Sequence, residues 1–399
     1  MKLSKRVVLL AVLGLSLNGC WGSDYKIGDV VRDDELTRVD SGPTLAPVSL
    51  SLTPCQDRLE IDTFAILEGT LDCAGRPCAL PRYVNIESRV TVTSDGSELF
   101  VTIGLDDSLY YGRVQRGRVG PLRVLAPPAA YARTSGDLLV IAHKRIPGSN
   151  DYTSTVYRFG PDVPELLVSV PGLANRVTGS AAAFALRGHG FRSSPELSDE
   201  FDWLSRHDAD GTTLFLRQFP GTTHWNDIAL GGQGTLFEYR VEFPDVSSLV
   251  RYDLSGDSQQ FATVPESYRQ AAAVGTDDRF VVATAESTNL GGSPSSLGVR
   301  AYDASGSELW SYQGLKPIGR QEMRAVVARN GDAYVATGFL EPGTTHAVLG
   351  VLRFSPTGQV CLAGSWTFEQ SFQGPVGLVE VDDGVIVATP HRLGIVPKR

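Results

Sequence analysis

Short apolar runs alternate with turn residues along most of the chain, and one pattern recurs at a fixed interval. The segments DDRFVVATA, GDAYVATGF and DGVIVATPH each place turn residues before an apolar run that carries Val-Ala-Thr. The threonines of these runs, Thr284, Thr337 and Thr389, are 53 and 52 residues apart. Alternating apolar and polar positions beside Gly/Asp turns predict β-hairpins. A constant period of this length predicts a repeat architecture.

Weaker copies extend the repeat toward the N-terminus. Four earlier segments bring the hairpins of this kind to seven: VTVTSDGSELFVTIG, YARTSGDLLVIAHK, RVTGSAAAFALRG and DIALGGQGTLFEY. A second series alternates with the first: VYRFGPDVPELLVSV, LSRHDADGTTLFLRQF, VRYDLSGDSQQFATV, VRAYDASGSELWSYQ, LRFSPTGQVCLAGSW and the weaker YYGRVQRGRVGPLRVL. Two hairpins per repeat make four strands, which is one blade of a β-propeller. The pattern therefore predicts an all-β chain with seven four-stranded blades.

The last blade needs strands from both ends of the chain, because the second series has only six members. We expect HRLGIVPKR at the C-terminus to supply the third strand and residues 48–52 to supply the fourth, which would close the ring and cover its open edges. One segment, SSPELSDEFDWLSRH at 193–207, favours a helix because helix-start signals precede its acids. A pair of β-sandwiches is the rival fold, but the regular period argues against it.

The N-terminus has the pattern of a secretory leader. A basic start precedes an apolar run from Val7 to Leu17, which is too short to span a bilayer. The following Leu17-Asn18-Gly19-Cys20 resembles the lipobox of bacterial lipoproteins. That resemblance implies removal of residues 1–19 and acylation of Cys20, and Trp21, in place of an aspartate, implies the outer membrane of a Gram-negative bacterium. The alternative is a plain signal peptide with an incidental cysteine.

Residues 20–46 are polar and acidic, which predicts a flexible tether before a propeller domain at 47–399. Loss of the leader removes three basic residues and no acid, so Lys+Arg falls from 36 to 33 against 45 acids and the net charge changes from −9 to about −12. An acidic chain without a basic run lacks the charge pattern of nucleic-acid binding. Membrane attachment would rest on the lipid, since no polybasic patch is present.

Four cysteines remain after Cys20, and an even number in an exported chain favours disulfides. Cys73 and Cys78 bracket the turn AGRP, which leaves Cys55 and Cys361 as a long-range pair, although three pairings are open. The spacing matches zinc sites poorly, and no CxxC redox motif occurs, so we expect no metal at these cysteines.

One repeat carries a family resemblance. AYDASGSELW, at 301–310, resembles the repeat of quinoprotein-type propellers and of outer-membrane assembly lipoproteins that share it, roughly A-x-D-x-x-[TS]-G-x-x-x-W. The resemblance implies that Asp303 and Gly306 fix the hairpin and that Trp310 docks between blades. The turn is one residue shorter than the pattern, and RYDLSGDSQQF has Phe261 instead of tryptophan. No recognisable quinone-contacting or calcium-binding set accompanies the repeat, so we expect no cofactor.

Candidate chemistry gathers in the third repeat. Histidines and carboxylates there could form an acid–base or metal site, because imidazole titrates near neutral pH. The turn DADG, Asp208 to Gly211, is equally explained by hairpin geometry and is too short for a calcium loop. The residues that we assign to a candidate ligand face are His189, Arg192, His224, Trp225 and Asp227, and His207 lies near them in sequence.

No serine-hydrolase elbow, HExxH or phosphate-binding loop is present. Tryptophans such as Trp203 could line a glycan or peptide face, but such residues more often fill blade cores. The sequence therefore predicts a monomeric, non-catalytic lipoprotein propeller that binds a protein or an envelope glycan. The alternative is a propeller enzyme, a hydrolase or lyase, that acts on glycan or peptide.

Overall fold

The computed structural model describes the chain from residue 52 to residue 398 with short gaps. The gaps are 57–59, 67–69, 80–89, 95–97, 106–107, 116–117, 127–131, 135–138, 147–151, 160–163, 180–182, 194–197, 221–225, 243–245, 266–269, 287–295, 319–322, 341–346, 368–376 and 390–391. Cys20 and the predicted tether lie outside the described residues. None of the described residues forms a helix long and apolar enough to cross a bilayer.

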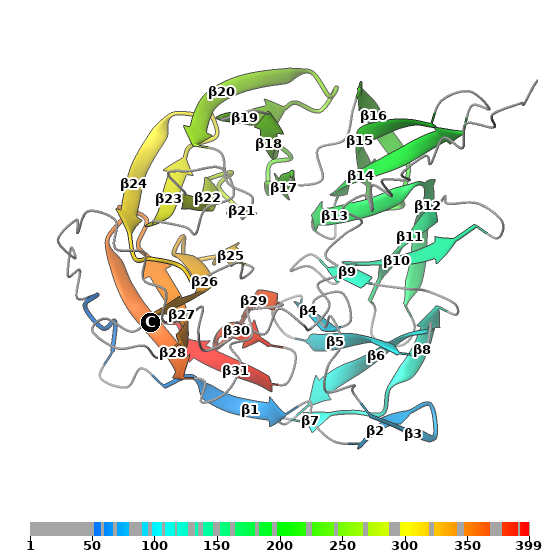
Figure 1. Cartoon of the computed structure of the whole chain (residues 1–399), viewed down its shortest axis with the longest axis horizontal. Coiled ribbons are helices and arrows are strands. Elements are labelled where there is room, and N and C mark those ends of the chain that lie inside the picture. The colour runs from blue at the N-terminus through cyan, green and yellow to red at the C-terminus, as the bar shows by residue number, and fades with distance from the viewer. Residues whose placement is uncertain are drawn as a thin grey trace, which may run out of the picture.

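Seven four-stranded antiparallel sheets stand around a common centre as the blades of a propeller (Figure 1). Blade one contains β4 (Val90–Ser94), β5 (Leu99–Leu105), β6 (Ser108–Gln115) and an outer strand divided into β7 (Arg118–Val119) and β8 (Arg123–Ala126). Blade two contains β9 (Ala132–Thr134), β10 (Leu139–Arg145), β11 (Tyr152–Arg158) and β12 (Glu165–Pro171). Blade three contains β13 (Leu173–Gly179), β14 (Ala183–Ser193), β15 (Ser198–Asp208) and β16 (Thr213–Pro220).

The remaining blades repeat this order from the centre outward. Blade four contains β17 (Asp227–Leu230), β18 (Leu236–Glu242), β19 (Val246–Tyr252) and β20 (Ser258–Pro265). Blade five contains β21 (Gln270–Val274), β22 (Phe280–Glu286), β23 (Ser296–Tyr302) and β24 (Glu308–Gly314). Blade six contains β25 (Arg324–Val327), β26 (Ala333–Leu340), β27 (Ala347–Phe354) and β28 (Val360–Thr367). The predicted seven blades are confirmed.

Blade seven combines both ends of the described chain. β29 (Gly377–Val381), β30 (Gly384–Ala388) and β31 (Arg392–Pro397) come from the C-terminal side, and β1 (Asp62–Ile66) pairs with β31 as the fourth strand (Figure 1). The prediction that residues 48–52 supply this strand is wrong. Before β1, Pro54 and Glu60 bridge to Leu362 and Ser365 of β28. The later segment is therefore the one that reaches β31.

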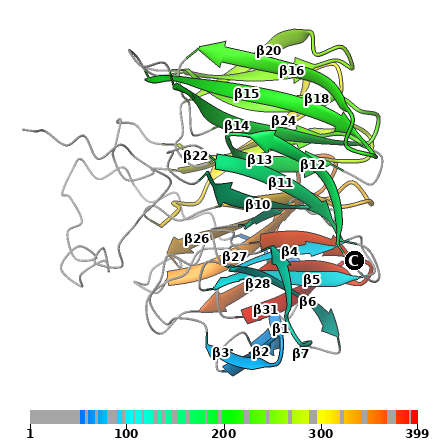
Figure 2. The same cartoon turned by 90° about the vertical axis from the view of Figure 1, so that its right-hand side faces the viewer.

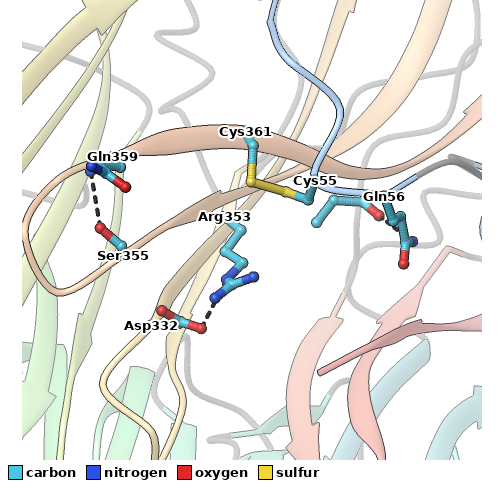
Figure 3. The surroundings of a disulfide bond; sticks show 8 residues. Cys55, Gln56, Asp332, Arg353, Ser355, Gln359 and Cys361 are labelled. Atoms are coloured by element: carbon cyan, nitrogen blue, oxygen red, sulfur yellow. Dashed lines mark hydrogen bonds and ion pairs between the residues drawn. A yellow bond between two sulfur atoms is a disulfide. The ribbon is translucent and has the colours of Figure 1, made fainter. Parts of the chain in front are cut away.

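A disulfide joins this N-terminal segment to blade six, as expected for the long-range pair. Cys55 and Cys361 are bonded, and the backbone N of Cys55 donates to the carbonyl of Leu362 over 2.9 Å (Figure 3). Ile61 lies six residues after Cys55, and its carbonyl accepts from Nε1 of Trp366 over 2.8 Å. The segment is thus fixed to blade six on both sides of residues 57–59.

The other two cysteines lie on the hairpin of β2 (Thr70–Cys73) and β3 (Arg76–Ala79), which bonds to blade one through Leu122. Its register places Cys73 opposite Arg76 and Cys78 opposite Leu71, so the two positions are diagonal. Their side chains lie outside the described residues, and the pairing of Cys73 with Cys78 stays a prediction.

Blades pack face to face, so that β11 of blade two lies beside β13 of blade three (Figure 2). Each outer turn also covers the preceding blade. Asp303 accepts from the backbone N of Ser305 and Ser307, while Gly306 has a φ of +90° and leaves no room for a side chain above Phe261. Trp310 in turn stacks on Phe354 of blade six with ring centroids 5.4 Å apart. These three residues therefore fix a turn and a seam between blades.

The prediction of a helix at 193–207 is wrong, because residues 198–208 form β15. This strand pairs with β14 along all eleven of its residues and with β16 on its other edge. Trp203 packs its ring over Gly188, where a Cβ atom would lie 2.3 Å from the indole. Pairing on both edges outweighs the local helix-start signals.

Candidate functional site

The junction between blades three and four changes character along its length. Near the outer turns it is apolar, with Leu204 and Phe215 of blade three packed against Leu236, Val250 and Tyr252 of blade four. Toward the other end of the same strands, the face of blade four carries Glu238 and Arg240. Alternation along β18 places both on the side of Leu236, and hence facing blade three.

Glu238 is the centre of a buried ionic cluster. Its side chain is fully buried, and its Oε1 accepts from Nε of Arg187 over 2.8 Å and from Nδ2 of Asn226 over 3.2 Å. Its Oε2 accepts from the hydroxyl of Tyr252 over 2.5 Å and from Nη2 of Arg240 over 2.9 Å. Each oxygen therefore accepts from two side chains, as a buried carboxylate requires.

Arg187 joins the strands of blade three to this carboxylate. Its Nη2 donates to Asp202 over 3.0 Å and its Nη1 to the carbonyl of Trp203 over 3.0 Å. The ring of Phe219 lies 5.0 Å from the guanidinium of Arg187 and 4.8 Å from that of Arg240, which is cation–π distance. Two arginines and two carboxylates make the cluster formally neutral.

The cluster sets the protonation of its members. Burial by itself would raise the pKa of Glu238, but the charges of Arg187 and Arg240 outweigh it and hold this pKa below the usual value. Burial and then the negative charge of Glu238 raise the pKa of Tyr252, so the phenol stays protonated and donates. The resting cluster is an ionised carboxylate between two charged arginines.

Blades five and six carry apolar side chains at the position that corresponds to Glu238. Glu238 is the third residue of its strand, and the third residues of β22 and β26 are Val282 and Val335, both fully buried. Ala283 is the blade-five counterpart of Arg187. Arg187 lies three residues after Phe184, which pairs with His207. In the same way, Ala283 lies three residues after Phe280, which pairs with Tyr302. At the junction of blades five and six, Ala283 and Val335 belong to one apolar cluster. The same fold therefore accommodates apolar side chains at this position.

Only two residues of the predicted ligand face, His189 and Asp227, have side chains within the described residues. His189 is buried on β14 opposite Asp202, two residues from Arg187 and on the same face of the sheet. Asp227 accepts from Nε of Arg176 over 3.1 Å and from the backbone N of Ala272 over 2.9 Å, so it connects blades three, four and five. Arg192 lies at the end of β14, but its side chain is outside the described residues, as are His224 and Trp225.

The other predicted acid–base residues lie elsewhere in blade three. His207 is buried against Phe184, with ring centroids 4.8 Å apart, and hydrogen-bonds Ser205 over 2.9 Å. Burial lowers its pKa. Asp208 and Asp210 are in the exposed outer turn, where both accept from the backbone N of Thr212. Across the described ranges, no three His, Cys, Asp or Glu side chains form a group that could hold a metal ion.

Sequence reasoning did not single out Asn226, Glu238, Arg240 and Tyr252, the blade-four half of the cluster. One signal was available. When TLFEYRVE, RFVVATAE and AYVATGFL are aligned on their hairpins, a glutamate stands in blade four where the other two have valine. A charge at a position that repeats as apolar predicts a buried, paired carboxylate.

No family model matches the chain, and no curated protein matches it. Among solved structures, it is similar to the acylaminoacyl peptidase of Pyrococcus horikoshii, with 10% identity, a TM-score of 0.49 and coverage of 77% of this chain and 50% of the peptidase. The chain thus spans half the length of that peptidase.

Two further solved structures are similar to the chain. The β-propeller domain of the Trilobed protease from Pyrococcus furiosus shows 10% identity, a TM-score of 0.47 and coverage of 77% and 92%. TolB from Acinetobacter baumannii shows 12% identity and a TM-score of 0.38, with coverage of 78% of this chain and 79% of TolB. These likenesses assign no function to this chain.

Proposed function

We propose that the chain is a monomeric envelope lipoprotein whose propeller is a non-catalytic binding module for a protein or an envelope glycan. In this proposal residues 1–19 are the leader, the acylated Cys20 holds the chain at the outer membrane, and residues 20–46 are the tether. The binding surface is the junction of blades three and four.

The observation that carries the proposal is the ionic cluster of Arg187, Asp202, Glu238 and Arg240. A buried ion network is at best weakly stabilising compared with well-packed apolar side chains of similar volume. Blades five and six use such apolar side chains at the corresponding junction. A rigid network that the fold does not need is typical of a site that holds polar groups in place for a ligand.

Photo-crosslinking in intact cells tests the proposed surface. A photoreactive residue would replace Thr263, which is exposed and pairs with Ser248 on the face toward blade three, or Gln313, the sixth residue of β24 as Thr263 is of β20. We expect adducts from position 263 and none from position 313. Protease or glycan-digesting enzymes then show which class of partner is attached.

The double variant Arg187→Ala/Glu238→Val copies the apolar junction of blades five and six. If it still folds, it should lose the adducts from position 263. Equal adducts at both positions, or adducts that survive in the folded double variant, would overturn the proposed surface.

Metabolic palmitate labelling tests the anchor separately. The wild-type chain should incorporate label, and Cys20→Ser should abolish incorporation and leave precursor or soluble protein. Undiminished labelling of that variant would reject acylation at Cys20 without affecting the proposed binding surface.

The alternative, a propeller enzyme acting on glycan or peptide, is favoured by one specific observation. His189 faces Asp202 across the β14–β15 pair, on the same side as the Glu238 cluster. Turnover of glycan or peptide substrates that is lost in His189→Gln, while adducts from position 263 persist, would establish this alternative.

A further inference from the structure

We infer that the end of the junction between blades three and four that carries Arg240 is a subsite for a neutral, hydroxyl-bearing sugar ring. The inference rests on the proposed binding function and names the class of its ligand. It is carried by Arg240 and Phe219, whose side chains are partly exposed, and by Ser248, which is buried beside Arg240.

Arg240 presents a held hydrogen-bond donor at this point. Its Nε and Nη2 donate to Glu238, and Nη2 also donates to the hydroxyl of Tyr252. No described residue accepts from its Nη1, and its side chain is 24% exposed, unlike the buried Arg187. The guanidinium is therefore fixed on one side and offers Nη1 on the other.

Ser248 adds an unsatisfied hydroxyl beside it. Ser248 pairs directly with Arg240 in the register of β18 and β19, which places both side chains on the face toward blade three. Its side chain is fully buried, and its Oγ has no hydrogen-bond partner among the described residues. A buried hydroxyl without a partner costs about 1–3 kcal/mol, so a ligand group that bonds to it gains affinity.

The charge balance decides the class of ligand. The cluster holds two arginines and two carboxylates, so an anionic group would bring an uncompensated charge next to Glu238 and a cation would face Arg240. A hydroxyl fits both groups, since its oxygen accepts from Nη1 of Arg240 and its proton reaches Oγ of Ser248. Neighbouring hydroxyls on a sugar ring supply this combination, and Phe219 provides an apolar surface beside them.

The test is calorimetric titration of the full chain with neutral oligosaccharides built of glucose, mannose or N-acetylglucosamine, and with a glucuronate-containing oligosaccharide as the charged comparison. We expect a neutral sugar to bind more tightly than the uronate. Ser248→Ala should weaken that binding about two- to tenfold, the effect of one hydrogen bond. Arg240→Lys, which keeps the charge but loses the fork, should weaken it as well.

Ser247→Ala is the matched control, because Ser247 is equally buried without a partner but pairs with Val241 on the opposite face of the sheet. Its titration should equal that of the wild type, and its melting temperature should match that of Ser248→Ala. Binding of the uronate alone, no binding of any neutral sugar, or equal effects of the two serine variants would overturn the inference. Protein adducts at position 263 without sugar binding would reject this subsite and leave the proposed binding function standing, whereas loss of both would reject both.

Discussion

Nε of Arg187 in blade three donates to Oε1 of Glu238 in blade four over 2.8 Å, between residues 51 positions apart in the chain. The pair crosses a junction that is apolar at the equivalent place between blades five and six. The contribution of this pair to the free energy of unfolding can therefore be compared with that of the apolar side chains at the junction of blades five and six.

A double-mutant cycle makes that measurement. Glu238→Val alone should cost about 3–5 kcal/mol of unfolding free energy, because it leaves Arg187 buried without its carboxylate. The double variant Arg187→Ala/Glu238→Val should cost less than the sum of its two single variants, since it removes both buried charges together. Denaturant unfolding gives the four free energies. Additive losses would show that the two side chains do not interact.

The pH dependence of stability follows from the lowered pKa of Glu238. A carboxyl group whose pKa is lower in the folded chain stabilises it above the unfolded value of about 4.3, and this contribution is lost as the pH falls through the folded pKa. The free-energy gap between wild type and Glu238→Gln should be largest near neutral pH and narrow below about pH 4. Glu98→Gln, which removes a half-buried carboxylate in blade one, is the control for loss of charge. A gap that stays constant down to pH 3 would contradict the lowered pKa.

The turn glycines make a third prediction, about packing. Gly306 has a φ of +90°, and a Cβ there would lie 2.6 Å from Cβ of Phe261. Gly331 has a similar φ of +86°, but its nearest neighbour would be Cγ of Pro356 at 3.4 Å. Both alanine variants carry backbone strain, whereas only Gly306→Ala also overpacks the seam between blades. The Gly306→Ala variant should therefore be less stable than Gly331→Ala by about 1–3 kcal/mol, measured by denaturant unfolding. Equal stabilities would show that the seam accommodates the methyl group.

The blade count could be predicted because the pattern of one blade recurs along the sequence. Each Asp-x-Ser/Asp-Gly turn and each Val-Ala-Thr strand is a local signal, and agreement among copies strengthened it. The closing strand had no second copy for comparison. Residues 48–52 and Asp62–Ile66 are both plausible strands, and only the path of residues 54–60 along β28 decides between them.

The site could be predicted only in part, because its contacts join different blades. His189 was assigned to the candidate ligand face from the sequence, but nothing local connects it or Arg187 to Glu238 or Tyr252. His207 shows the opposite case, since its position beside Asp208 and Asp210 suggested chemistry. Burial against Phe184 gives it a packing role instead.

Ring closure provides the last prediction, because two independent links hold the N-terminal segment. Asp62–Ile66 extends blade seven by pairing with β31, and the disulfide between Cys55 and Cys361 closes a loop of 306 residues. Three variants distinguish the contributions of the two links to stability. Deletion of 21–50 should leave the unfolding midpoint nearly unchanged, since it ends before Leu52 and Thr53, the first described residues that contact blade six. Cys55→Ser with Cys361→Ser should lower stability by up to about 5 kcal/mol in the chain-entropy model.

Deletion of 21–66 with Cys361→Ser removes both links and exposes the edge of β31. It should unfold several degrees below the disulfide variant and aggregate, because an unpaired strand edge is a template for another chain. Chemical reduction of the wild-type chain should reproduce the disulfide variant and not the deletion. If the long deletion melted with the disulfide variant and stayed monomeric, β1 would add nothing to closure. The covalent link would then hold the ring alone.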